Sequence, residues 1–459
     1  KVIRQNHIGD WGTQFGMLIA LLREKLPDAL TQPERVHLED LEAFYREASA
    51  RDKEDPAFAE RARQEVVKLH HKDPDTMRAW QYIVDESRRH YMPIYERLGV
   101  SLTQADERGE SFYADRLPGV VEELERAFGA APAGPPAGVD APSIHVTESD
   151  GALCVFHYNG QEPAFKGPEG NAFPMIIRKS DGAYLYATTD LAGVVFRTRE
   201  LKADRIIYVT DARQALHFAM VFATARAAGW TLADGRTREV KLEHVTFGSI
   251  LGEDRKPFKT RGGDTVKLAE LLEEAVNRAE ALIRASEADP ERKRGFTEEE
   301  IRDIAEAVGI GAVKYADLSQ NRQSDYVFSW DKMLAMEGNT APYLMYAYAR
   351  IRSIYRRGAE SGAAGGSITL TEPAERVLAR QILRFPDTLE SAAATLKINL
   401  LTDYLYELAG QFMRFYESCP VLGAPTPETR ASRLRLCDLT ARTLQIGLGL
   451  LGIRVVERM

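Results

Sequence analysis

The feature that most constrains the fold is a change of pattern near residue 267. Short β-like runs separated by turns occupy residues 143–186, and strand and helix then alternate up to residue 247, as a parallel α/β sheet requires. From Lys267 onward nearly all apolar residues recur at helical spacing, apart from a Gly/Ala/Ser-rich break at 358–367. We therefore predict an α/β domain followed by an all-helical bundle.

The individual elements can be predicted from the same patterns. Pro residues near the first turn mark helices in the charged region before residue 128, and Gly- and Asp-containing turns separate the strands. A Pro/Gly/Ala segment at 129–138 indicates a linker or an exposed loop. The expected helices are 33–50, 56–71, 74–98, 190–201 and 215–228, and the expected strands are 153–156, 175–177, 184–186, 205–209 and 244–247.

The chain opens on a glycine-rich stretch, Asn6–Gly16. A short β-type run, Val2–Arg4, precedes it, and an apolar helical run, Met17–Leu22, follows it. A strand, a glycine-punctuated loop and a helix together form the unit in which a helix N-terminus binds an anion. The sequence His7-Ile8-Gly9-Asp10 within it has the form of a nucleotide-binding motif.

Composition and charge limit the class of protein. With 44% hydrophobic and 28% charged residues, the sequence is that of an ordinary globular protein, and no run approaches the roughly 18–20 apolar residues of a membrane helix. Three scattered cysteines form neither a disulfide framework nor a metal-ligand spacing, which predicts a cytoplasmic setting.

The net charge is −8, but residues 335–459 hold 14 Arg and 1 Lys against 12 acidic residues, a net of +3. This excess of arginine fits phosphate contacts or an ordinary solvated helical surface.

Two clusters in the sheet region have the residue types of a ligand site. Tyr186 and Asp190 stand at the end of a predicted strand and the start of a helix, where α/β sheets bind ligands, although Thr189 or Asp190 as a helix N-cap is the ordinary alternative. Gln214 and His217 follow the next strand at the same edge, or are first-turn residues facing solvent.

The second cluster is a basic, glycine-ended loop at 252–263. Its lysines and arginines suit contact with a triphosphate, and the alternative is a solvated loop. The sequence contains no Ser/His/Asp set, no paired carboxylates at helical spacing and no Cys/His ligand pattern. An enzyme of this kind would act by positioning and electrostatics.

Seven segments, taken in order, resemble the arginyl-tRNA synthetases of bacterial type, a family of class I aminoacyl-tRNA synthetases. They cover essentially the whole chain, and their order makes the resemblance specific. The segments are 6–16, 109–111 (GES), 186–190, 208–217, 247–268, 308–321 (VGIGAVKYADLSQN) and 337–350 (EGNTAPYLMYAYAR).

The resemblance implies an α/β fold, a Rossmann-type parallel-sheet catalytic domain with an insertion, followed by an all-α anticodon-binding helical bundle. It implies that ATP, arginine and tRNA(Arg) are converted to arginyl-tRNA, AMP and pyrophosphate. The expected domains are the first half of the catalytic domain (1–30), a mostly helical insertion (31–145), the second half (146–266), a helical stem-contact region (267–334) and the anticodon-binding domain (335–459).

The resemblance also implies which residues bind arginine. Glu110 is expected close to the substrate, Tyr186 and Asp190 are expected to recognise the guanidinium, and Gln214 to complete the pocket, while Asp10 and Gln14 shape its wall. A carboxylate answers the fixed fork of guanidinium donors with two hydrogen bonds, which a lysine substrate cannot use in the same way.

The loop Phe258-Lys259-Thr260-Arg261 occupies the place of the class I KMSKS motif, with Thr260 at the position of the second lysine. Catalytic contacts are therefore expected from Lys259, Thr260 and Arg261, with either Lys259 or Arg261 making the transition-state contact. ATP is expected to bind at Gly248, His217, Phe258 and Lys259, as a substrate accompanied by Mg²⁺ and without a protein-bound metal.

The family's HIGH motif and its N-terminal tRNA-elbow domain are expected upstream of Lys1. His7-Ile8-Gly9-Asp10 is then a look-alike that belongs to the following strand and loop, and the chain alone is expected to be inactive.

The expected tRNA contacts are Tyr343, Tyr346, Arg350 and the C-terminal Met459, because splayed bases stack on aromatic rings and guanidinium planes. A tyrosine stripe at helical spacing also fits a buried core. The expected protein is a cytoplasmic monomer with no membrane contact. The alternative function is a non-catalytic RNA-binding protein on the same scaffold.

Overall fold

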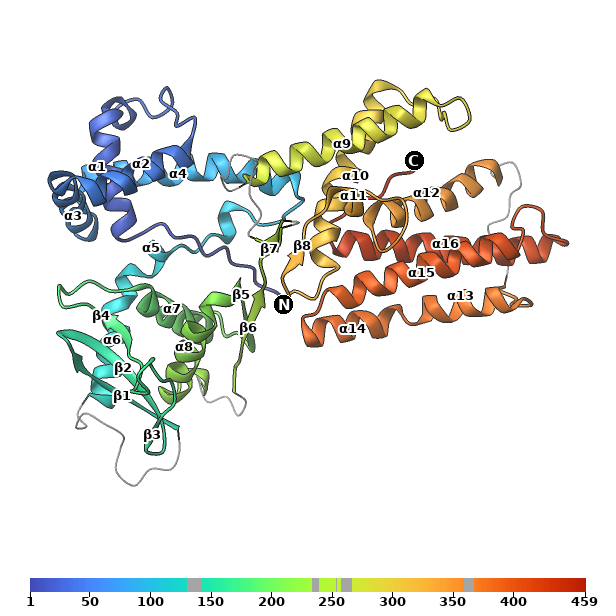
Figure 1. The fold of residues 1–459 in the computed structure, drawn as a ribbon. Helices are drawn as coiled ribbons and strands as arrows, with labels where there is room; N and C mark the ends of the chain where they lie inside the picture. Colours follow the sequence, from blue (N-terminus) through green and yellow to red (C-terminus); the bar gives the residue numbers. More distant parts are fainter. Residues whose placement is uncertain (130–141, 233–238, 253, 257–265, 359–366) are drawn as a thin grey trace. The chain divides into compact units, whose positions relative to one another are not determined.

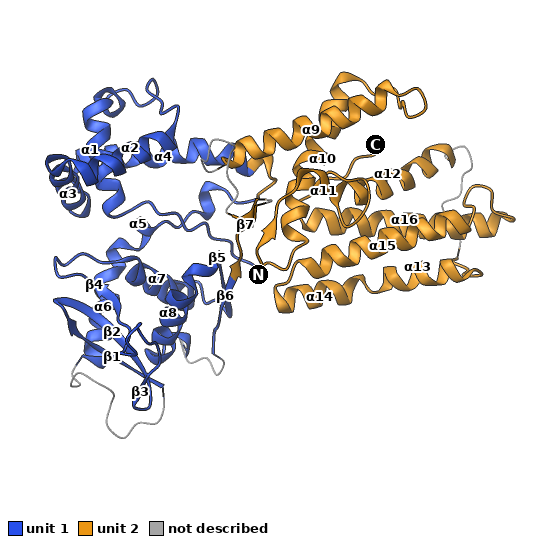
Figure 2. Cartoon of the chain, in the orientation of Figure 1, with its two compact units in different colours: residues 1–95, 101–245 blue, residues 96–100, 246–459 orange. Residues whose placement is uncertain are grey.

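The structure is a computed structural model that describes residues 1–129, 142–232, 239–252, 254–256, 266–358 and 367–459. It consists of two compact units, residues 1–95 with 101–245 and residues 96–100 with 246–459 (Figure 2). Among the described residues, no helix is long and apolar enough to span a bilayer.

The described residues of the first unit form two hydrophobic cores, built from helices and strands that Figure 1 labels. One core joins α1 (Thr13–Lys25), α2 (Leu41–Glu54), α3 (Pro56–His70) and α4 (Pro74–Arg97). The other joins a small sheet to α5 (Glu110–Tyr113), α6 (Leu117–Phe128), α7 (Tyr186–Val195) and α8 (Ala215–Ala227). A π-helical turn, Phe196–Glu200, follows α7 directly.

The sheet of the second core is antiparallel, with β2 (Ala152–Asn159) between β1 (Pro142–Ser149) and β4 (Met175–Arg178), and with β3 (Glu162–Pro163) pairing the end of β2. The predicted turn at Asp150-Gly151 is confirmed. Both residues have positive φ, 49° and 77°, which is the geometry of a two-residue hairpin loop.

Strand and helix then alternate as predicted, through β5 (Arg205–Asp211), α8 and β6 (Lys241–Phe247). In the described part of the chain, β5 and β6 form a two-stranded sheet. Tyr208 and Ile206 of β5 point into the core, whereas Ile207 and Val209 are exposed.

The second unit is almost entirely helical, as predicted. Its helices are α9 (Leu268–Ala288), α10 (Glu298–Leu318), α11 (Trp330–Met333), α12 (Ala341–Gly358), α13 (Pro373–Leu383), α14 (Phe385–Thr395), α15 (Asn399–Ser418) and α16 (Pro427–Leu450). A short parallel pair joins β7 (Ile250–Leu251) to β8 (Tyr326–Val327). Helix α15 contacts α12, α13, α14 and α16, and its side chains Leu405, Leu408 and Phe412 are fully buried at the centre of this bundle (Figure 1).

Three predicted elements are wrong in type or extent. Val2–Arg4 forms no strand, and only Asn6 bridges to Glu107. The helix predicted from residue 33 begins at Leu41, because the Asp40 carboxylate accepts a hydrogen bond from the Ala43 N–H and fixes the N-terminus there. The strand predicted at 184–186 is a single bridge at Tyr184, since α7 already begins at Tyr186.

Candidate active site

The first unit contains a large cavity of about 1120 Å³. Five segments that are distant in sequence meet around it: the opening stretch, α5, α7 with its π-helical turn, β5 and α8. Polar side chains line much of the wall, which is typical of a site for a charged ligand. They include Gln5, Asn6, His7, Glu110, Tyr186, Asp190, Arg197, Arg213, Gln214 and His217.

The side chains of Asp190 and Tyr186 both contact the imidazole of His217. The Asp190 Oδ2 and His217 Nε2 atoms are 2.6 Å apart, and the Tyr186 ring packs on the imidazole at 4.7 Å between centroids. Tyr186 and Asp190 are four residues apart in α7, so both lie on one face of the helix. The predicted alternative, an N-cap at Thr189 or Asp190, is wrong because Leu185 holds the N-cap position.

Glu110 begins α5 and lies above a second, buried carboxylate, that of Asp10. Asp10 accepts hydrogen bonds from the Ser111 N–H at 2.8 Å and from the Ser111 hydroxyl at 2.6 Å. A Cβ atom on Gly109 would lie 2.4 Å from an Asp10 carboxylate oxygen, so only glycine permits this approach. Burial, with the nearby charges of Asp10 and Asp190, raises the pKa of Glu110 to about 7. The cavity is thus a place where negative charge is crowded and where a cation would be stabilised.

Replacing Glu110 with Gln is expected to stabilise the fold at high pH. The folded pKa of about 7 exceeds the ordinary 4.5, so the folded state binds more protons between these values and its free energy of unfolding falls as pH rises through them. Allowing for partial solvent screening, E110Q should raise the free energy of unfolding by about 1–2 kcal/mol at pH 8 and leave it unchanged at pH 4. Thermal unfolding at both pH values measures this. The exposed Glu169→Gln is the control, and equal melting temperatures of E110Q and the parent at pH 8 would contradict the account.

Arg197 is a cavity residue that the sequence did not reveal. Its guanidinium donates to Gln5 Oε1 at 2.7 Å and to the Tyr208 hydroxyl at 2.8 Å, and lies 5.0 Å from the centre of the Tyr208 ring. A Cβ atom on Gly193 would lie 2.9 Å from Arg197 Nη1, so this glycine leaves room for the guanidinium. Arg197 has no carboxylate within ion-pair distance among the described residues, which leaves a positive charge at the cavity wall for an anionic group of a ligand.

The other three predicted arginine-binding residues, Gln214, Asp10 and Gln14, occupy different positions relative to the cavity. Gln214, at the start of α8, is exposed and lines the cavity. Asp10 supports the Ser111 backbone from behind, and its own carbonyl accepts a hydrogen bond from Trp80 Nε1 at 2.6 Å. Gln14 is exposed on α1 and does not line the cavity. His7, treated as a look-alike in the sequence, does line it, and burial lowers its imidazole pKa.

The predicted ATP and catalytic residues lie partly outside the described structure. Phe258, Lys259, Thr260 and Arg261 are outside the described residues, and Gly248 belongs to the second unit. His217 is in the first unit, within the cavity. In the part of the chain that the structure describes, no group of three or more His, Cys, Asp or Glu side chains is arranged to hold a metal ion.

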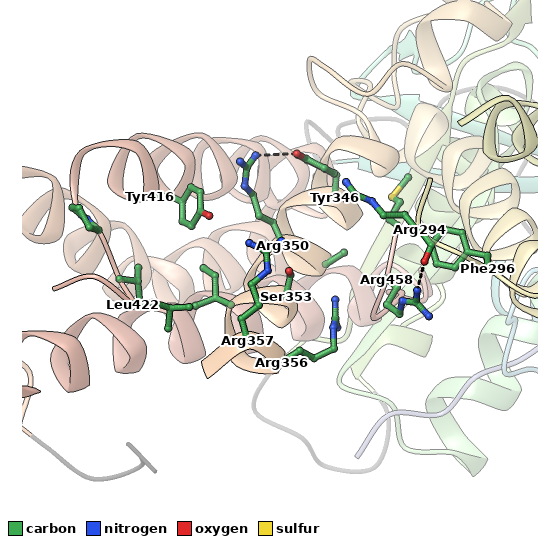
Figure 3. Close-up of a pocket in the computed structure, with 15 residues that line it drawn as sticks. Arg294, Phe296, Tyr346, Arg350, Ser353, Arg356, Arg357, Tyr416, Leu422 and Arg458 are labelled. Carbon is green, nitrogen blue, oxygen red and sulfur yellow. Dashed lines mark hydrogen bonds between the residues drawn. The ribbon is translucent and has the colours of Figure 1, made fainter. Parts of the chain in front are cut away.

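A second pocket, of about 450 Å³, lies in the second unit and is strongly basic. Three of the four predicted tRNA contacts, Tyr346, Arg350 and Met459, line it, and Figure 3 labels Tyr346 and Arg350 among the lining side chains. Among the described residues that line it, five are arginines and none is acidic; the arginines are Arg294, Arg350, Arg356, Arg357 and Arg458.

Arg350 lies at the aromatic side of this pocket. Its Nη1 donates to the Tyr346 hydroxyl at 2.9 Å, and its guanidinium lies 4.7 Å from the centre of the Tyr416 ring (Figure 3). The fourth predicted residue, Tyr343, does not line the pocket and packs on Tyr406 at 5.7 Å between centroids. Guanidinium planes beside aromatic rings provide surfaces on which unpaired bases stack.

Comparisons with known proteins agree with this arrangement. Residues 1–330 match the family model for tRNA synthetases class I (R), catalytic domain, and residues 344–459 match the DALR anticodon binding domain. The arginine–tRNA ligase of a Synechococcus species is 50% identical over 100% of this chain and 74% of its own length. That of Laribacter hongkongensis is 49% identical, again over 100% of this chain and 74% of its own length.

Solved structures have the same fold. Arginyl-tRNA synthetase from Plasmodium falciparum superimposes with a TM-score of 0.74 at 30% identity, over 100% of this chain and 70% of that one. The Thermus thermophilus enzyme gives a TM-score of 0.72 at 24% identity, over 100% of this chain and 76% of that one. The predicted catalytic α/β domain and helical anticodon-binding domain are confirmed, and the chain belongs to the arginyl-tRNA synthetase family of class I aminoacyl-tRNA synthetases.

Proposed function

We propose that the protein is an arginine–tRNA ligase, which activates arginine with ATP and transfers it to tRNA(Arg). The observation that carries this proposal is the cavity in which Glu110 and Asp190 crowd negative charge, with Tyr186 packed beside them. A guanidinium entering there replaces carboxylate repulsion with charge-assisted hydrogen bonds. Lysine carries the same charge but lacks the planar fork of donors, so it fills fewer of the acceptors.

In this proposal arginine is recognised by four side chains, those of Asp190, Glu110, Tyr186 and Gln214. Asp190 binds the guanidinium, held in orientation by His217 at 2.6 Å, and Glu110 provides a second acceptor that ionises when the cation arrives. Tyr186 covers the planar group, and Gln214 at the cavity wall completes the pocket. Asp10 supports the wall by accepting a hydrogen bond from the Ser111 N–H, and Arg197 favours an anionic group of a bound substrate. Gln14 does not line the cavity, so it is assigned no contact with arginine.

Activation requires the arginine carboxylate to attack the α-phosphate of ATP, which forms arginyl-adenylate and releases pyrophosphate. We assign ATP contacts to Gly248, His217, Phe258 and Lys259, and the stabilisation of the transition state to Lys259, Thr260 and Arg261. ATP enters as its Mg²⁺ complex, because Mg²⁺ is usually held through substrate phosphates. Transfer to the terminal ribose of tRNA then releases AMP. Chemistry of this kind depends on positioning and electrostatics, without a covalent enzyme intermediate.

We assign tRNA contacts to Tyr343, Tyr346, Arg350 and Met459, supported by the basic wall of the second pocket. The subdivision proposed from the sequence separates the helical insertion (31–145) and the stem-contact region (267–334) from the catalytic halves and the anticodon-binding domain. We further propose a monomer that acts in the cytoplasm, which fits three cysteines that are free and buried.

Aminoacylation tests this function directly. The protein carrying this chain is incubated with ATP, bulk tRNA and each of arginine and lysine in labelled form, and ester-linked amino acid on tRNA is counted. We expect arginine to be attached and lysine to be rejected. Binding of tRNA without formation of any aminoacyl ester would instead support the non-catalytic alternative.

A further inference from the structure

One arginine of the second unit, Arg322, joins its own segment to two other stretches of chain. Its Nη1 donates to the Thr246 carbonyl at the end of β6 at 2.8 Å, and its Nε donates to the Leu396 carbonyl at the end of α14 at 2.9 Å. Its own carbonyl accepts the Gly248 N–H at 2.7 Å. Thr246 and Gly248 belong to the part that matches the catalytic family model, whereas Leu396 belongs to the anticodon-binding domain.

On the catalytic side, the segment that follows Thr246 makes close backbone contacts with the segment that follows Arg322. A Cβ atom on Gly248 would lie 2.7 Å from the Ser324 carbonyl, so the two backbones approach too closely for any residue other than glycine at this position. The Ser249 N–H donates to Asp325 Oδ1 at 2.7 Å, and β7 then pairs with β8 in parallel (Figure 1). The segment that carries Arg322 therefore fixes the position of Gly248, an assigned ATP contact.

On the anticodon side, Leu396 is where α14 ends. Its backbone is left-handed, with φ 56° and ψ 32°, and its carbonyl has no partner within its own helix, so the guanidinium satisfies it and faces the negative end of the helix dipole. Helix α15 begins three residues later, and Tyr315 holds its first turn by donating to the Thr402 carbonyl at 2.9 Å.

Helix α15 connects this junction with the assigned tRNA contacts. Tyr406 in its first half packs on Tyr343, and Tyr416 near its end lies under the Arg350 guanidinium. A single helix of 20 residues, about 30 Å long, thus runs from the basic pocket to the residues beside Leu396.

We infer that Arg322 is a positioning residue that couples occupation of the basic pocket by tRNA to the placement of Gly248 for reaction with ATP. The inference rests on the proposed ligase function. The physical reason is the planar guanidinium, whose donors have fixed directions, so both carbonyls are satisfied in one relative placement of Leu396 and Thr246, which both belong to the second unit. A shift of α15 when a base stacks on Tyr346 or Arg350 moves Leu396, and Arg322 passes this movement to Thr246.

The test is a double-mutant cycle in the full protein. Arg322→Ala and Arg322→Lys are each made alone and in a Tyr346→Ala background, with the exposed Arg442→Ala on α16 as the matched control. The turnover number for aminoacylation at saturating substrates, the tRNA and arginine dissociation constants and the melting temperature are measured for each.

We expect Arg322→Ala to lower the turnover number about 5- to 100-fold, with both dissociation constants changed less than about 3-fold. Arg322→Lys should not restore the rate, because one ammonium cannot reproduce the fork. In the Tyr346→Ala background, Arg322→Ala should lower the turnover number further by less than about 3-fold. The contact through which bound tRNA acts is already removed in that background.

Several results would overturn the inference. Independent, multiplicative losses in the cycle would show that the two residues do not communicate, and full restoration by lysine would show that only the charge matters. If Arg322→Ala unfolds, the lysine variant, which keeps the charge and the side-chain length, decides the outcome. An unmutated protein that cannot attach arginine to tRNA would instead refute the proposed function itself.

Discussion

Replacing Asp190 with Asn should lower kcat/KM for arginine by about 100- to 1000-fold, the size of effect expected when one partner of a buried charge pair is removed. The Asp190 side chain is only 15% exposed, so little water can replace the lost charge. The loss should appear mainly in KM, because the guanidinium contact exists in both the ground state and the transition state. Steady-state aminoacylation at varied arginine concentration measures it.

The matched control for this prediction is Asp115→Asn. It makes the same chemical change in the same unit, at a carboxylate that is 76% exposed and pairs with Lys72 on the surface. It should change kcat/KM less than 2-fold, since surface ion pairs contribute about 0–1 kcal/mol. An Asp190→Asn variant within 3-fold of the parent and equally stable would show that Asp190 does not recognise the substrate.

Replacing Arg350 with Ala should weaken tRNA binding about 10- to 100-fold. The guanidinium lies between Tyr346 and Tyr416, and its removal takes away both a stacking surface and a positive charge in the basic pocket. The dissociation constant should also respond less steeply to salt, because the basic pocket loses one cation. Filter binding with tRNA over a salt series measures both quantities.

Arg380→Ala on α13 is the control for Arg350→Ala. Arg380 is exposed, has the same charge and does not line the pocket. It should leave the tRNA dissociation constant within about 2-fold of the parent at physiological salt. Equal weakening by the two variants would indicate general attraction of RNA to a basic surface and would remove the specific role of Arg350.

The sequence predicts best where one local pattern decides the structure. Tyr186 and Asp190 are predicted to share one site, and both line the cavity because their four-residue spacing places them on one face of α7, although the strand predicted before them is only a single bridge. The first residue of a helix is harder to predict. The helix expected from residue 33 starts only at Leu41, because Asp40 provides a side-chain cap that a helical apolar pattern does not reveal.

Properties that arise from distant partners could not be predicted. The raised pKa of Glu110 depends on Asp10, which is 100 residues earlier, and on burial, which no local pattern shows. Arg197 is one arginine in a charged helix end, and its place in the cavity wall depends on Gln5 and Tyr208. Similarly, Tyr343 and Tyr346 belong to one predicted stripe, but only Tyr346 lines the basic pocket.

In the proposed arginine site, Glu110 and Asp190 bind a guanidinium through its charge and its donors. Calorimetric titration of the protein with arginine and with citrulline tests this most directly, because citrulline has nearly the same shape but carries a neutral ureido group. We expect citrulline to bind at least about 100-fold more weakly than arginine. Equal affinity for the two ligands would contradict the assignment of this cavity as the arginine site.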